Sequence, residues 1–222
     1  MIYDKVVVGE FVSRPNRFIA QVKIDGKIET VHVKNTGRCK ELLIPKCKVY
    51  LSVSNNPNRK TKYDLIAVGK QGLGLVNIDS QAPNQVVLEW LKTKEFDVVK
   101  PEYTFGDSRL DFYLEKDERK ILIEVKGCTL EVDGIGYFPD APTSRGVKHL
   151  NALAKAVKMG YECYICYVIQ MPKVDVVKPN ISTDEKYSQA YFNALEKGVK
   201  PLFLRCDVTP NTLKIIDENV LI

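Results

Sequence analysis

The first 80 residues consist of short runs in which apolar and polar positions alternate, which is the pattern of half-buried β-strands. Asp25-Gly26 separates two of these runs and predicts a hairpin turn, and residues 37–43 predict a short turn or helix. The predicted strands are residues 3–12, 17–24, 28–34, 47–54 and 63–70. Short strands of this kind around one small insert favour a closed barrel of the OB type, with an SH3-like barrel as the alternative.

Beyond residue 80 the pattern changes, because runs with helical spacing alternate with apolar strands. One predicted helix runs to Met159 and begins at Thr143 or Ser144, either of which can cap it. The other predicted helices are residues 81–92 and 187–197. Residues 96–104 lead into a hairpin, and the predicted strands are residues 109–114, 121–126, 161–171, 201–208 and 213–216. This order indicates an α/β fold with a mixed sheet. We therefore expect two domains, residues 1–80 and residues 81–222.

The hairpin at residues 109–126 carries the candidate chemistry of the second domain. Alternation places Asp111 on the polar face of its first strand, and Glu124 and Lys126 together on one face of its second strand. Two carboxylates and the carbonyl of Val125 form an oxygen ligand set that suits Mg2+ or Mn2+. The lysine can orient a water or stabilise charge on a phosphate. The spacing resembles the D-x(n)-E-x-K core of the PD-(D/E)xK nuclease superfamily, and an edge hairpin with a solvated polar face is the alternative.

Three further residues are candidates for the same site. Glu89 lies amid the apolar face of the helix at residues 81–92. The resemblance implies a metal-ligand role for it, because nucleases of this superfamily often carry a glutamate on the helix before the core sheet. Arg145 and Lys148 lie in the first turn of the helix that ends at Met159, where positive charge opposes the helix dipole. We predict that they hold a phosphate, and a solvated basic face is the alternative.

The positive charge of the chain is concentrated in its first part. The formal net charge is +5, and residues 1–80 contain fourteen Lys and Arg against seven Asp and Glu. A basic barrel predicts contact with a polyanion, namely DNA or RNA, through phosphates and without sequence readout. The turn at residues 35–38 suits a phosphate-binding corner. The candidate phosphate ligands of this part are Arg14, Arg17, Arg38 and Lys40. A surface that is basic for solubility alone is the alternative.

The composition argues against several other classes of protein. The six cysteines are scattered, and Cys163 and Cys166 lie on a predicted buried strand, so we expect buried thiols rather than disulfides or a zinc site. No apolar run is long enough to span a membrane, and the first residues lack the pattern of a secretory signal. We expect a cytoplasmic protein. The sequence leaves its oligomeric state open, with a homodimer among the options.

Long segments of the chain are similar to the sugar fermentation stimulation protein A (SfsA) family. They are VKNTGRCKELL, CKVYLSVS, APNQVVLEWL, SRLDFYL, LIEVKGCTL, GYFPDAPTSRGVKHL and RCDVT, in the family's order. The resemblance implies an OB-like domain followed by a PD-(D/E)xK-like domain, with DNA binding as the family's described activity. Two functions follow as expectations. The first is a Mg2+-dependent nuclease that uses Asp111, Glu124 and Lys126. The alternative is a DNA-binding regulatory protein of sugar or maltose metabolism whose nuclease-like domain is not catalytic.

Overall fold

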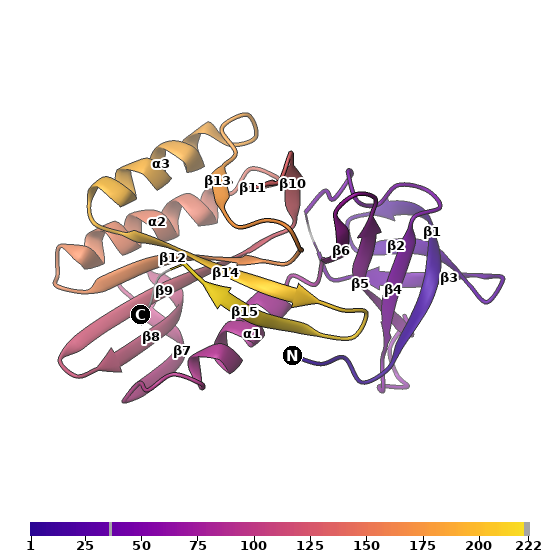
Figure 1. Ribbon diagram of the computed structural model, residues 1–222, viewed down its shortest axis with the longest axis horizontal. Coiled ribbons are helices and arrows are strands. Elements are labelled where there is room, and N and C mark those ends of the chain that lie inside the picture. The colour runs from indigo at the N-terminus through magenta and orange to yellow at the C-terminus, as the bar shows by residue number, and fades with distance from the viewer. Residues whose placement is uncertain (36, 220–222) are drawn as a thin grey trace.

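A barrel and a mixed sheet lie side by side in the computed structural model, which describes residues 1–35 and 37–219 (Figure 1). The barrel sheet has the order β3-β2-β1-β4-β5-β6, and a parallel pairing of β3 with β5 closes it. Its strands are β1 (Val6–Asn16), β2 (Ile19–Ile24), β3 (Lys27–Val33), β4 (Lys48–Val53), β5 (Tyr63–Lys70) and β6 (Gly74–Asn77). Alternate positions such as Val22, Val49 and Leu51 are fully buried inside it. The predicted closed barrel is confirmed.

The second sheet is mixed, as predicted. Its order is β15-β14-β12-β9-β8-β7, in which β9, β12 and β14 are parallel and the outer pairs are antiparallel. Its strands are β7 (Val98–Phe105), β8 (Ser108–Lys116), β9 (Arg119–Cys128), β12 (Glu162–Ile169), β14 (Lys200–Val208) and β15 (Leu213–Glu218). A smaller sheet of β10 (Leu130–Val132), β11 (Ile135–Phe138) and β13 (Val177–Pro179) stands beside it. The sequence did not predict this smaller sheet, because three or four residues are too few to show a period.

Helices cover both faces of the large sheet (Figure 1). They are α1 (Ala82–Leu91) on one face, and α2 (Ser144–Val157) and α3 (Glu185–Glu196) on the other. Thr143 caps α2 by accepting a hydrogen bond from the N–H of Gly146. The two faces of β9 follow the predicted alternation, because Ile123 packs with α1 and Leu122 packs in the cluster of α2. Cys163 and Cys166 are buried on opposite faces of β12, as three-residue spacing on a strand requires.

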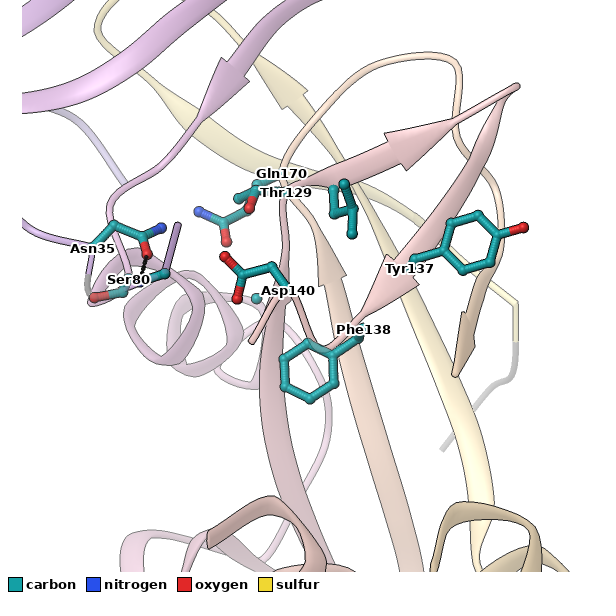
Figure 2. A pocket seen from close by; sticks show the side chains of 10 residues that line it. Asn35, Ser80, Thr129, Tyr137, Phe138, Asp140 and Gln170 are labelled. Carbon is teal, nitrogen blue, oxygen red and sulfur yellow. Dashed lines mark hydrogen bonds between the residues drawn. The ribbon is translucent and has the colours of Figure 1, made fainter. Parts of the chain in front are cut away.

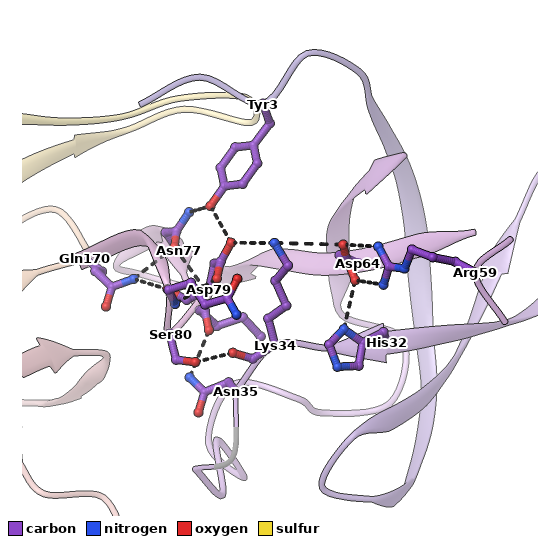
Figure 3. Close-up of polar contacts among 12 residues, drawn as sticks. Tyr3, His32, Lys34, Asn35, Arg59, Asp64, Asn77, Asp79, Ser80 and Gln170 are labelled. Carbon is purple, nitrogen blue, oxygen red and sulfur yellow. Dashed lines mark hydrogen bonds and ion pairs between the residues drawn. The ribbon is translucent and has the colours of Figure 1, made fainter. Parts of the chain in front are cut away.

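Buried polar side chains join the barrel to the large sheet (Figure 3). Gln170, just after β12, donates to the side chain of Asn77 at 2.9 Å and to the carbonyl of Asp79 at 3.2 Å. The hydroxyl of Tyr3 donates to the Asp79 carboxylate at 3.2 Å, and Lys34 pairs with that carboxylate at 3.3 Å. Buried polar groups require fixed partners, so this network fixes the orientation of the two units. No helix in the described residues is long and apolar enough to cross a membrane.

Candidate metal and nucleic-acid site

The hydrogen-bond ladder between β8 and β9 stops at the pair Phe112–Ile123, and Asp111 lies just beyond it. Its carboxylate accepts the backbone N–H of Val125 at 2.7 Å and the side-chain amide of Asn84, on α1, at 2.7 Å. The strands therefore diverge here, and a carboxylate replaces the missing ladder acceptor. The divergence also breaks the alternation of this strand. Leu110 and Phe112, two residues apart, would share a face of a regular strand, but they pack on opposite sides of the sheet.

Glu124 is the most deeply buried acidic residue of the site, with 1 % of its surface exposed. Its Oε1 accepts hydrogen bonds from Lys126 Nζ and from Nδ1 of His149, which is itself buried on α2. An ionised carboxylate only accepts hydrogen bonds, so Nδ1 of His149 carries the proton. Among the described residues, Glu124 Oε2 is buried and has no hydrogen-bond partner.

His149 and Asn84 were not among the predicted site residues. His149 lies four residues after Arg145, so the two share one face of α2. That spacing is a signal in the sequence that could have identified His149. Asn84 lies in the first turn of a helix whose relation to the sheet only the fold establishes.

The two carboxyl groups have pKa values shifted in opposite directions. Burial raises the pKa of Asp111, and the charge of Glu124 raises it further. Burial also acts to raise the pKa of Glu124, but the His149 hydrogen bond and the charge of Lys126 outweigh it and lower that pKa. The site is therefore short of positive charge beside Asp111, and it contains a buried oxygen without a partner. A divalent cation with oxygen ligands fits both observations.

Glu89 does not join this site, so the predicted three-carboxylate ligand set is not formed. Its carboxylate pairs with the N-terminal amine of Met1 and accepts from Gln85 at 3.3 Å, and nearly half of its side chain is exposed. The five-residue step from Asn84 turns Glu89 by about 140° around the helix, away from Asp111. Within the described part of the chain, no three His, Cys, Asp or Glu side chains gather as a metal site. A cation here would retain waters, as Mg2+ usually does.

Arg145 and Lys148 lie at the start of α2, as predicted, but they differ in placement. Arg145 is exposed and shares the helix face that carries His149. Lys148 is half exposed and donates to the carbonyl of Asp107 at 2.7 Å, in the turn between β7 and β8. Phosphate contact therefore stays a prediction for both, and only Arg145 is on the helix face directed towards Glu124.

The barrel loop after β3 approaches the second sheet. The backbone N–H of Arg38 donates to the carboxylate of Asp140 at 3.1 Å, and the side chains of Arg38 and Lys40 are exposed. Thr36, in the predicted phosphate-binding turn, lies outside the described residues. The side chain of Arg17 is also exposed and stacks over Phe18, 5.8 Å from the ring centre.

Arg14, a predicted phosphate ligand, bonds the chain itself in this structure. Its guanidinium donates to four backbone carbonyls at 2.6–2.9 Å, those of Arg17, Asn35, Gly37 and Arg38. These donors brace the loop and are not available to a phosphate. A basic residue beside a turn in the sequence looks the same whether it binds a ligand or the chain's own carbonyls.

Family models match both parts of the chain. The "SfsA N-terminal OB domain" matches residues 12–78, and the "Sugar fermentation stimulation protein RE domain" matches residues 81–212. The chain belongs to the SfsA family. A sugar fermentation stimulation protein homolog of Desulfitobacterium hafniense (strain Y51) is 52% identical over 220 residues, covering 98% of this chain and 96% of that one. A homolog of Clostridium beijerinckii is 48% identical over 221 residues, covering 98% and 97%.

A solved SfsA structure agrees with the fold. SfsA of Pyrococcus furiosus, solved in complex with Ca2+, is 27% identical and superimposes with a TM-score of 0.85 over 98% of this chain and 96% of that one. The expected family and the expected OB-plus-α/β architecture are therefore confirmed.

Proposed function

We propose that this SfsA-family protein binds DNA and hydrolyses its phosphodiester bonds with Mg2+ or Mn2+ as cofactor. The observation that carries the proposal is the convergence of Asp111 and Glu124 at Val125, with Lys126 on the same Glu124 carboxylate. Glu124 is buried and Asp111 and Lys126 are partly buried. Removing these charged groups from water has a cost in free energy that a ligand-binding role would explain.

Each side chain has a distinct role in this proposal. Asp111 and the unpartnered Oε2 of Glu124 would hold the cation, and the Ca2+ complex of the Pyrococcus furiosus protein supports an oxygen-ligand site in the family. When bound, the cation supplies charge neutralisation at the phosphate and activation of water. Lys126 positions the attacking water, and His149 holds Glu124 in place. These roles do not need the sequence of the nucleic acid to be read.

Basic groups from both units would hold the strand beside the site. Arg38 and Lys40 are exposed on the barrel loop that reaches Asp140 of the second unit, and Arg145 is exposed at the start of α2. Contacts of this kind give salt-dependent affinity without base specificity. We propose DNA as the polyanion and test RNA beside it.

The test is cleavage of labelled single-stranded DNA, double-stranded DNA and RNA in Mg2+, Mn2+ or EDTA, with binding scored on the same samples. The key variants are Asp111→Asn, whose amide oxygen can still accept the Val125 N–H, and Lys126→Ala. The control is Lys120→Ala, which removes an exposed lysine from the same strand. We expect metal-dependent cleavage that falls by at least about 100-fold in the two key variants. Both key variants should still bind the nucleic acid, and Lys120→Ala should cleave it as the wild type does.

Binding that weakens with salt, with no cleavage of any substrate in either metal, would reject the nuclease and leave a DNA-binding protein. Cleavage that persists in Asp111→Asn would move the chemistry elsewhere in the chain. Absence of binding to all three nucleic acids would reject the nucleic-acid role itself.

A further inference from the structure

A small cavity lies between the barrel loop and the second unit, one residue beyond Lys126 (Figure 2). Its volume is about 190 Å³, and its walls include Gly37 from the barrel side and Gly127, Thr129, Phe138 and Asp140 from the other. Pockets for drug-sized ligands measure about 300–1,000 Å³, and a water occupies ~30 Å³ of liquid. The cavity is therefore too small for a whole nucleotide and larger than a site for one or two waters.

Two glycines allow the walls to come this close. A Cβ on Gly37 would lie 2.1 Å from the carboxylate of Asp140, and a Cβ on Gly127 would lie 2.3 Å from the side-chain oxygen of Gln170. Any other residue at either position would displace the polar atom that faces it. The glycines thus hold Asp140 Oδ2 and Gln170 Oε1 against the backbone at the cavity wall.

The polar atoms of the cavity are mainly acceptors. The Gln170 amide nitrogen donates to Asn77 and Asp79, and this bonding directs its oxygen towards Gly127. Asp140 accepts one backbone N–H, from Arg38, and forms no ion pair with the described Lys and Arg residues. A carboxylate without a paired cation repels a phosphate and favours a ligand that donates hydrogen bonds.

One wall of the cavity is aromatic and rigid. The ring of Phe138 lies beside Asp140 in Figure 2. It packs against the ring of Tyr187, 5.1 Å away between centroids, and against Tyr167 at 5.8 Å. An aromatic residue and hydrogen-bond acceptors on the walls of one cavity match a planar heterocycle with an amino group, because the aromatic residue offers apolar contact and the acceptors bind the amine.

We infer that this cavity receives one unstacked nucleobase of the bound strand, and that it selects bases with an exocyclic amino group, as in cytosine and adenine, over thymine. This inference rests on the proposed nucleic-acid binding. Its position supports it, because exposed Arg38, whose backbone N–H bonds Asp140 of the cavity wall, would hold a phosphate next to the base. Asp140 accepts from the amine, as acidic side chains do with cytosine N4.

The experiment measures binding of equal-length oligo(dC), oligo(dA) and oligo(dT) by fluorescence anisotropy in EDTA and at fixed salt, so that cleavage plays no part. The readout is the ratio of affinities, amino-bearing base over thymine, because a general change in charge alters all three affinities alike. Asp140→Asn removes the charge and keeps an oxygen for the Arg38 N–H. Thr129→Leu fills the cavity instead. Asp133→Asn is the matched control, since Asp133 is exposed in the β10–β11 turn.

We expect each of the two cavity variants to lower that ratio about fivefold or more, the low end of discrimination by base contacts, while Asp133→Asn leaves it unchanged. An unchanged ratio in both cavity variants overturns the base pocket and leaves DNA binding intact. A wild-type protein that binds none of them rejects the inference together with the DNA role of the proposed function.

Discussion

The contact between His149 and Glu124 provides the sharpest test of the site, because both side chains are buried. His149→Phe keeps a ring of similar size and removes the donor, so Glu124 retains only Lys126. Hydrogen bonds to buried charged groups are worth ~1.5–3 kcal/mol. For a chain of this length each kcal/mol lowers Tm by about 2–4 °C, so we expect a loss of roughly 3–12 °C in EDTA at pH 7.

The sign of the pH dependence follows from the lowered pKa of Glu124. A carboxyl whose folded pKa is below its unfolded value of ~4.3 stabilises the fold above that pH and loses this contribution as the pH falls through the folded pKa. The stability difference between the wild-type protein and His149→Phe is therefore full at pH 7 and shrinks at acidic pH. Urea unfolding of the two proteins at pH 7 and at a pH below the unfolded carboxyl value measures this stability difference.

The same variant tests whether His149 positions the proposed metal ligand. Loss of a partner that orients a ligand costs about 10–100-fold in metal affinity, which calorimetric titration with Mn2+ or Ca2+ measures without any cleavage assay. His149→Gln keeps a donor and should recover much of both losses. His32→Phe is the control, since His32 is the only other histidine and bonds Asp64 in the barrel. If His149→Phe matches the wild type in stability and in metal affinity, the reasoning is refuted.

Three further outcomes are expected. Burial and the charge of Glu124 raise the pKa of Asp111, which means that its ionised form is unfavourable in the fold. The neutral variant Asp111→Asn should therefore be more stable than the wild type in EDTA at pH 7. Mg2+ should raise the Tm of the wild type alone, and an equal rise in both proteins would contradict this. Arg14→Ala should lower the free energy of unfolding in urea by about 1–3 kcal/mol. Arg38→Ala should leave that free energy unchanged, and should reduce the slope of log DNA affinity against log salt concentration by ~1. Glu89→Gln should lower stability by only ~0.2–1 kcal/mol and change cleavage less than twofold, as its surface ion pair predicts; a large loss of cleavage would return it to the site.

Elements with a clear local period could be predicted from the sequence. The barrel strands, the hairpin of β8 and β9, and the cap of α2 at Thr143 follow from alternation, from Asp25-Gly26 and from side-chain capping, all of which act between residues close in the chain. Alternation also placed Glu124 and Lys126 on one face, where they meet. The order of these elements was enough to indicate a barrel followed by a mixed α/β sheet.

Long-range contacts decided the rest. The sequence shows Glu89 and Asn84 on one helix, but only the packing of α1 on the sheet brings Asn84 to Asp111 and leaves Glu89 to the N-terminal amine. It shows Arg14 as a basic turn residue, but only the folded loop supplies the four carbonyls that occupy it. A periodic pattern determines which way a side chain faces along its own element. The partner it meets depends on segments distant in the chain, so the tertiary structure alone determines it.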